Sequence, residues 1–281
     1  MTVGVTESEL RVGAMRTPLL SVGDRESSEA VVFVHGNPGS SRDWTGLLEA
    51  VGPVARGLAW DAPGFGHADK PASFDYTVGG YAEFIAQALD VLGVQRVHLV
   101  LHDFGGPWGL RWAVGHPEQL ASIVLVNTGA LVNYSWHTAA KIWRMPLLGE
   151  LVMATTTRPA FRMLMKVGNP RGLPQDFVDR MYDDFDTPTR KAVLKLYRAS
   201  PSSSPATEQL GGGLRALDRP ALVIWGAKDP YIPVEQAHLQ LRTFPSAEVN
   251  VLEDSGHWPF IDNPDRVREL VVPFLRRVVG S

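Results

Sequence analysis

A buried strand that leads through a tight turn into a helix limits the folds that this chain can adopt. Residues 97–101 (VHLVL) are rich in branched apolar side chains, which is typical of a strand inside a sheet. Residues 102–106 (HDFGG) bring two glycines, and residues 107–115 have the pattern of a helix. A strand, tight turn and helix in this order lift one side chain above the end of a sheet. Here that side chain is Asp103.

Short apolar runs alternate with helical segments along the first half of the chain. Two short apolar runs near the N-terminus predict a hairpin. Because the later runs are separated by amphipathic helices, we expect parallel strands covered by helices on both faces. The expected strands are residues 10–14, 19–22, 31–34, 57–60, 97–101 and 123–126, and the expected helices are residues 78–92 and 107–115.

The alternation stops after residue 126 and resumes near residue 221. Residues 129–213 contain helical segments but no convincing strand, and residues 200–205 and 211–213 have the composition of linkers. We therefore expect a core domain formed by residues 1–128 and 214–281, with residues 129–213 inserted as a helical cap. The later elements are expected at residues 221–225, 234–244, 248–252 and 264–279.

The composition excludes several classes of protein. The net charge of −3 and the absence of a basic run argue against a nucleic-acid surface. Without cysteine, the chain has no disulfide and no thiolate metal site, and we expect neither a metal nor a cofactor. The N-terminus has no export signal, and no apolar run reaches the ~20 residues of a membrane span. A cytoplasmic protein, monomeric or homodimeric, is the simplest interpretation.

Three residues that carry catalytic chemistry follow predicted strands in the order Asp103, Asp229 and His257. The ends of parallel strands face one crevice, so residues distant in sequence meet there. A carboxylate that attacks an ester gives an anhydride, whereas attack on a saturated carbon gives an alkyl ester that water can cleave. We expect Asp103 to be the nucleophile, His257 to deprotonate water, and Asp229 to orient His257.

The loop at residues 35–39 (HGNPG) follows the strand at residues 31–34. In this architecture that loop supplies one backbone N–H of an oxyanion hole, and the residue after the nucleophile supplies the other. The donors expected here are the amides of Asn37 and Phe104. An ordinary Asn-Pro-Gly turn is the alternative.

With these motifs, the chain resembles the α/β-hydrolase superfamily, and within it the aspartate-nucleophile branch of haloalkane dehalogenases and epoxide hydrolases. The resemblance implies an α/β-hydrolase fold, a small apolar organic substrate and water as the second reactant. The loop at 35–38 is similar to that of the dehalogenases, in which the Asn37 side chain would also bind halide. Phe104 departs from their pattern, because tryptophan is usual there and phenylalanine has no N–H to donate.

Dehalogenation of a haloalkane is favoured narrowly over epoxide hydrolysis on these motifs. A cap tryptophan, Trp136 or Trp143, is a candidate to replace the ring donor missing at residue 104. Epoxide opening needs cap tyrosines as acids, for which the resemblance proposes Tyr197 with Tyr134 or Tyr182. A ligand-binding protein without catalytic activity is the remaining alternative, because folds do not fix function.

Overall fold

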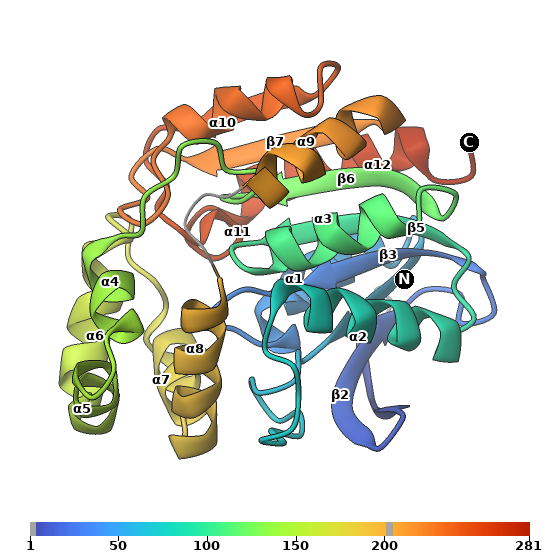
Figure 1. The fold of residues 1–281 in the computed structure, drawn as a ribbon. Coiled ribbons are helices and arrows are strands. Elements are labelled where there is room, and N and C mark those ends of the chain that lie inside the picture. Colours follow the sequence, from blue (N-terminus) through green and yellow to red (C-terminus); the bar gives the residue numbers. More distant parts are fainter. Residues whose placement is uncertain (1–3, 201–204) are drawn as a thin grey trace.

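The computed structural model describes residues 4–200 and 205–281, and its centre is an eight-stranded sheet (Figure 1). The strand order is β1-β2-β4-β3-β5-β6-β7-β8. β1 pairs antiparallel with β2, and β2 antiparallel with β4, while all later neighbours are parallel. The strands are β1 (Thr6–Val12), β2 (Met15–Val22), β3 (Glu29–Val34), β4 (Arg56–Trp60), β5 (Arg96–His102), β6 (Leu120–Val126), β7 (Ala221–Gly226) and β8 (Glu248–Leu252).

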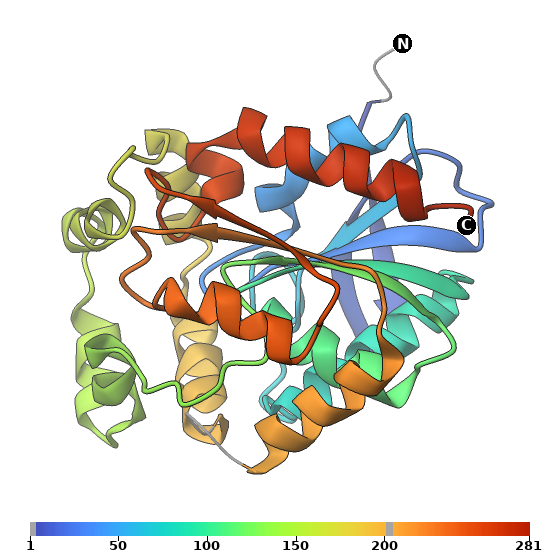
Figure 2. The same ribbon diagram turned by 90° about the horizontal axis from the view of Figure 1, so that it is seen from above.

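Helices cover both faces of this sheet. Viewed from above, α1 and α12 lie on one face, and α2, α3, α9 and α10 lie on the other (Figure 2). Every residue of β4, β6 and β7 is buried, which explains the continuous apolar runs in the sequence. The helices of these layers are α1 (Thr45–Val51), α2 (Val78–Val91), α3 (Gly105–Gly115), α9 (Pro205–Leu217), α10 (Glu235–Leu239), α11 (Pro259–Asp262) and α12 (Pro264–Val278), with short 3-10 turns η1 (Ser41–Trp44) and η2 (Gln240–Arg242).

Five further helices stand beyond the carboxyl ends of the strands (Figure 1). Ion pairs join them to the sheet domain, with Arg180 bound to Asp43 at 2.9 Å and Asp184 lying 3.2 Å from His67. All five come from the segment between β6 and β7. They are α4 (Thr138–Arg144), α5 (Leu148–Thr155), α6 (Arg158–Val167), α7 (Gln175–Asp183) and α8 (Thr187–Ala199).

The expected architecture of a mostly parallel sheet between helices is confirmed, and two local predictions differ from the structure. The expected linker at residues 211–213 lies inside α9. A Cβ at Gly213 would lie only 3.1 Å from Val114 of α3, so the glycine permits a close helix–helix approach. The expected helix at residues 234–244 is instead the short pair α10 and η2. Residues 201–204 of the other expected linker lie outside the described residues.

No helix in the described ranges 4–200 and 205–281 is long and apolar enough to cross a membrane.

One stacked pair of rings lies between α2 and α3. The ring centroids of Trp108 and Tyr81 lie 3.9 Å apart, the interplanar angle is 16°, and both side chains are buried. We expect Trp108→Ala to reduce the free energy of unfolding by about 3–5 kcal/mol, because a large cavity opens in the core. Urea unfolding measures this change. Trp108→Phe is the matched control and is expected to cost clearly less, and equal losses for the two variants would contradict the stacking argument.

Candidate active site

Asp103 occupies a strained turn at the carboxyl end of β5. Its φ of 48° is in the left-handed region, which costs a non-glycine residue about 1–3 kcal/mol. Nearby glycines make the turn possible, since a Cβ at Gly105 would lie 2.3 Å from the Val34 carbonyl oxygen. A Cβ at Gly36 would lie 2.3 Å from the Cβ of Asp103 itself. The two loops after β3 and β5 therefore interlock around the carboxylate.

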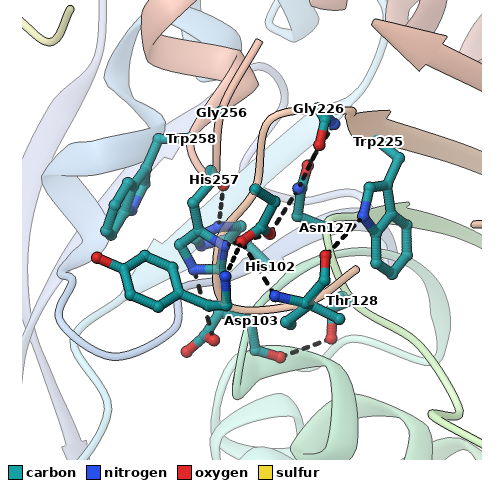
Figure 3. Close-up of polar contacts among 12 residues, drawn as sticks. His102, Asp103, Asn127, Thr128, Trp225, Gly226, Gly256, His257 and Trp258 are labelled. Atoms are coloured by element: carbon teal, nitrogen blue, oxygen red, sulfur yellow. Dashed lines mark hydrogen bonds and ion pairs between the residues drawn. The ribbon is translucent and has the colours of Figure 1, made fainter. Parts of the chain in front are cut away.

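The two oxygens of the Asp103 carboxylate have different surroundings. The backbone N–H of Asn37 donates to Oδ1 at 2.8 Å, so the loop predicted to hold an oxyanion does reach the carboxylate. Oδ2 lies 3.5 Å from Nε2 of His257. Below the turn, the Thr128 hydroxyl donates to the Asp103 backbone carbonyl at 2.6 Å (Figure 3). One oxygen thus lies at a backbone donor and the other beside an imidazole.

His257 lies between the two aspartates. Its Nδ1 is 2.7 Å from Oδ2 of Asp229. The second Asp229 oxygen accepts backbone N–H bonds from Tyr231 at 2.7 Å and Ile232 at 3.1 Å. These bonds hold the Asp229 carboxylate in place. The structure thus brings together the three residues expected from the sequence, Asp103, Asp229 and His257, at the ends of β5, β7 and β8.

Asn127, directly after β6, is a supporting residue that the sequence prediction missed. Its Nδ2 donates to Oδ2 of Asp229 at 2.7 Å, and its Oδ1 accepts from the Gly226 N–H at 2.9 Å (Figure 3). Its φ of 46° is also in the left-handed region, which asparagine tolerates better than most residues. The available signal was an asparagine placed immediately after a buried strand.

The two carboxylates determine the charge on His257. Burial alone would lower the pKa of this imidazole, but the charge of Asp229 and the hydrogen bond with Asp103 outweigh burial and raise it. For Asp103, burial would raise the pKa, yet the hydrogen bond and charge of His257 lower it below its ordinary value. In the resting protein Asp103 is therefore a carboxylate beside an imidazolium.

His102, the last residue of β5, is neutral by contrast. Burial and the nearby charge of His257 lower its pKa to about 3. Its Nε2 lies 2.8 Å from the backbone carbonyl oxygen of His257 and donates to it (Figure 3). His102 therefore fixes the backbone of the loop that carries His257.

A cavity of about 670 Å³ opens above Asp103. Tyr197 and Asn37 both line it, and Nδ2 of Asn37 lies 3.4 Å from the Tyr197 hydroxyl. Among the described residues, the proton of that hydroxyl has no acceptor. Burial, together with the charge of Asp103, raises the pKa of Tyr197 well above its ordinary value, so the phenol keeps its proton. The cavity therefore has an O–H donor, beside the Asn37 side chain, that no described residue uses.

The other aromatic candidates from the sequence are engaged elsewhere. The Tyr134 hydroxyl donates to the Tyr231 carbonyl at 3.1 Å, and the Tyr182 hydroxyl donates to the Thr156 carbonyl at 3.2 Å. Neither phenol proton is directed at Asp103. Tyr182 is also not among the residues that line the cavity.

Phe104 and the two cap tryptophans form an aromatic wall. Trp136 stacks on Phe104 with centroids 5.9 Å apart, and Trp143 packs against Tyr197 with centroids 5.0 Å apart. The Trp136 ring N–H is buried and has no partner among the described residues. Covered by protein atoms, it does not reach the cavity in this arrangement.

No group of three or more His, Cys, Asp or Glu side chains within the described part of the chain has the geometry to hold a metal ion.

The raised pKa of His257 gives a direct test of the Asp229 contact. We expect Asp229→Asn to lower the pKa of His257 by about 1–3, because the neutral amide no longer stabilises the imidazolium. An NMR titration of the imidazole measures this change. His98 of β5, which is bound to Glu29 of β3, is the internal control. An unchanged His257 titration would mean that Asp229 does not determine its charge.

The chain is similar to several known proteins. A protein of Mycobacterium bovis that has not been characterised is 30% identical over 89% of this chain and 76% of its own length. A 2-hydroxy-6-oxononadienedioate/2-hydroxy-6-oxononatrienedioate hydrolase of a Pseudomonas species is 27% identical, over 98% of this chain and 96% of its own. Among solved structures, the haloalkane dehalogenase DatA of Agrobacterium tumefaciens superposes with a TM-score of 0.85 at 24% identity, covering 98% of both chains.

The sequence profile of the α/β-hydrolase fold family matches residues 29–264, which span β3 to the start of α12 and include Asp103, Asp229 and His257. The chain belongs to the α/β-hydrolase fold family.

Proposed function

We propose that this hydrolase acts at a saturated carbon and forms an alkyl ester on Asp103. The observation that carries the proposal is the position of the Asp103 carboxylate, with Oδ1 at the Asn37 amide and Oδ2 beside His257. The 6-oxo substrates named for the Pseudomonas relative have carbonyl carbons. A carboxylate that attacks a carbonyl gives an anhydride, so that activity is not carried over to this chain.

In the first step Oδ2 of Asp103 bonds to the substrate carbon, and the bond to the leaving group breaks with its electron pair. Oδ1 becomes the ester carbonyl oxygen and keeps the Asn37 N–H bond. Because the ester is neutral, one of the two charges that raised the pKa of His257 is removed. The pKa of His257 then falls and the imidazolium loses its proton, to Tyr197 after an epoxide has opened or to solvent when a halide leaves. The neutral imidazole can then act as a base.

In the second step His257 takes a proton from water, and the hydroxide attacks the ester carbonyl carbon. The negative charge that develops on Oδ1 is stabilised by the Asn37 amide, which already donates to this oxygen. The Phe104 amide is the second donor that we expect, and each such donor contributes about 2.7–4 kcal/mol. Collapse of this intermediate releases the alcohol and restores the Asp103 carboxylate. The alcohol takes one proton of the water, and His257, held by Asp229, keeps the other, which restores the imidazolium of the resting site.

Of the two possible first steps, epoxide opening and halide release, the side chains favour epoxide opening. An epoxide oxygen leaves as an alkoxide and needs a proton, which the buried Tyr197 hydroxyl has available. The same oxygen accepts a hydrogen bond from Nδ2 of Asn37, 3.4 Å from the hydroxyl. Phe104 takes no part in this step through its ring, so the departure from tryptophan does not matter.

Halide release is the second candidate, and the Asn37 side chain favours it. Its Nδ2 and the Tyr197 hydroxyl together offer two donors to a departing halide. The Phe104 ring offers none, and the ring N–H of Trp136 is covered. Halide release would therefore depend on the Asn37 amide and the Tyr197 hydroxyl, without the tryptophan donor that is usual in the dehalogenases.

The ester can be trapped by removing its base. We expect His257→Phe, incubated with a panel of epoxides and haloalkanes, to gain the mass of one whole epoxide, because the ester forms and is not hydrolysed. Intact-mass spectrometry measures the gain. The matched control is the double variant with Asp103→Asn, which is expected to gain no mass. A gain of substrate minus hydrogen halide would favour halide release, and no gain on any substrate would contradict the ester.

Tyr197 separates the two leaving groups. We expect Tyr197→Phe to lower epoxide turnover by about 10²–10⁴, the usual effect of losing a positioned acid. Release of bromide from a bromoalkane is expected to fall much less, because a halide needs no proton. Steady-state kcat on both substrates measures the difference. Tyr182→Phe removes a phenol outside the cavity and is the matched control, and equal epoxide turnover in both variants would exclude Tyr197 as the acid.

A further inference from the structure

A histidine at the edge of the cap lines the cavity and has no part in the chemistry above. His137 precedes α4, and its Nδ1 accepts a hydrogen bond from the Ala140 N–H at 3.3 Å, so the side chain caps that helix. The ring lies in an aromatic setting, with centroid distances of 5.9 Å to Trp143 and 5.1 Å to Tyr231. These contacts hold the imidazole in one orientation at the cavity wall.

The helix cap also decides where the His137 proton is. Burial lowers the pKa of His137 to about 4 against the opposing charge of Asp103, so the ring is neutral near pH 7 and carries one proton. Because Nδ1 accepts the Ala140 N–H, the single proton is on Nε2. Nε2 has no hydrogen-bond partner among the described residues, and protein atoms do not enclose it. A fixed N–H donor therefore faces the cavity.

A second neutral donor is on the neighbouring ring. Tyr231 lies between His137 and His257, with centroid distances of 5.1 Å and 5.0 Å. Within the described ranges its hydroxyl has no protein partner, and burial with the charges of Asp229 and Asp103 raises its pKa, so it keeps its proton. Much of the remaining wall is apolar. A substrate that leaves a buried donor unpaired is bound less tightly than one that pairs with it.

The charges of the site decide which acceptor fits these donors. At His137 the negative charges of Asp103 and Asp229 act against the positive charge of His257, so the balance of charge there is negative. Arg111 also lines the cavity, but its charge is not among those that act on His137. An anionic group bound at His137 would be repelled in a poorly solvated cavity. A neutral oxygen has no such penalty and satisfies the donor.

We propose that His137 is a specificity-determining residue that binds a neutral oxygen acceptor, a carbonyl or an ether, on the part of the substrate that does not react. The inference rests on the proposed hydrolysis at a saturated carbon. The cavity of about 670 Å³ has room for a substrate that extends from Asp103 to His137. The substrate class is therefore an epoxide or haloalkane with one remote neutral oxygen, and remote carboxylates are excluded.

Matched substrates test the proposal. Terminal epoxides and bromoalkanes are compared in sets of equal chain length, with a plain chain, with an ether oxygen in place of one methylene, and with a terminal carboxylate. The parent protein is expected to show the highest kcat/KM with the ether. In His137→Phe we expect that advantage over the plain chain to fall by roughly tenfold, the usual value of one hydrogen bond to a buried donor. A preference that His137→Phe leaves unchanged, or a preference for the carboxylate, would overturn the proposal.

A second variant separates binding from helix capping. His137→Asn keeps a good cap for α4, because asparagine is among the preferred N-cap residues, but its amide is too short to reach as far. We expect His137→Asn to restore thermal stability without restoring the ether preference. Restoration of both would mean that His137 is only structural.

Ligand binding keeps this test independent of turnover. Binding of unreactive ethers and alkanes of equal length to Asp103→Asn can be measured by calorimetry, with and without His137→Phe. If the ether advantage depends on His137 while no ester is trapped on Asp103, the proposed reaction fails and the donor site stands. If the ester is trapped and the ether advantage is absent, the proposed reaction stands and the donor site at His137 is wrong.

Discussion

The close approach of two loops at Asp103 is the constraint on which the rest of the site depends. Gly36, after β3, packs directly on the Asp103 side chain, and only a residue without Cβ leaves room there. Gly105 makes the same kind of contact with the end of β3, so α3 can begin immediately after the turn. The left-handed backbone of Asp103 is thus stabilised from both sides. Without that interlock, the carboxylate would have neither its backbone donor nor its place beside His257.

A single imidazole between two carboxylates connects the geometry to the proposed sequence of steps. Asp229 is held by two backbone N–H groups and by Asn127, so its position and charge stay the same throughout. Asp103 is the variable partner, since its charge is present before alkylation and absent after it. His257 consequently stabilises the nucleophile first and becomes a base only when the ester exists. No movement of the cap is needed for this change of role.

The sheet and the three converging residues were predictable because each follows a buried apolar run, and parallel strands end at one edge. Helix α9 was not predictable, because three adjacent glycines disfavour an isolated helix. Packing of Gly213 against α3 compensates for this low helix propensity. The roles of Tyr197 and Tyr134 differ only through their tertiary partners. His137 and Tyr231 were missed for the same reason, because nothing near them in sequence indicates what they contact. The only signal for Asn127 was its place directly after a buried strand.

The hydrogen bond between Asn127 and Asp229 has a consequence for how such a site can change over time. The ends of β6 and β7 lie so close that the side-chain atoms of these residues meet at 2.7 Å. Exchanging amide and carboxylate between them would conserve both the charge and the bond. Either single replacement is unfavourable, since two carboxylates would repel each other and two amides would leave His257 without its acid. Moving the acid from the end of β7 to the end of β6 would therefore need both substitutions together, because each of them alone weakens the site.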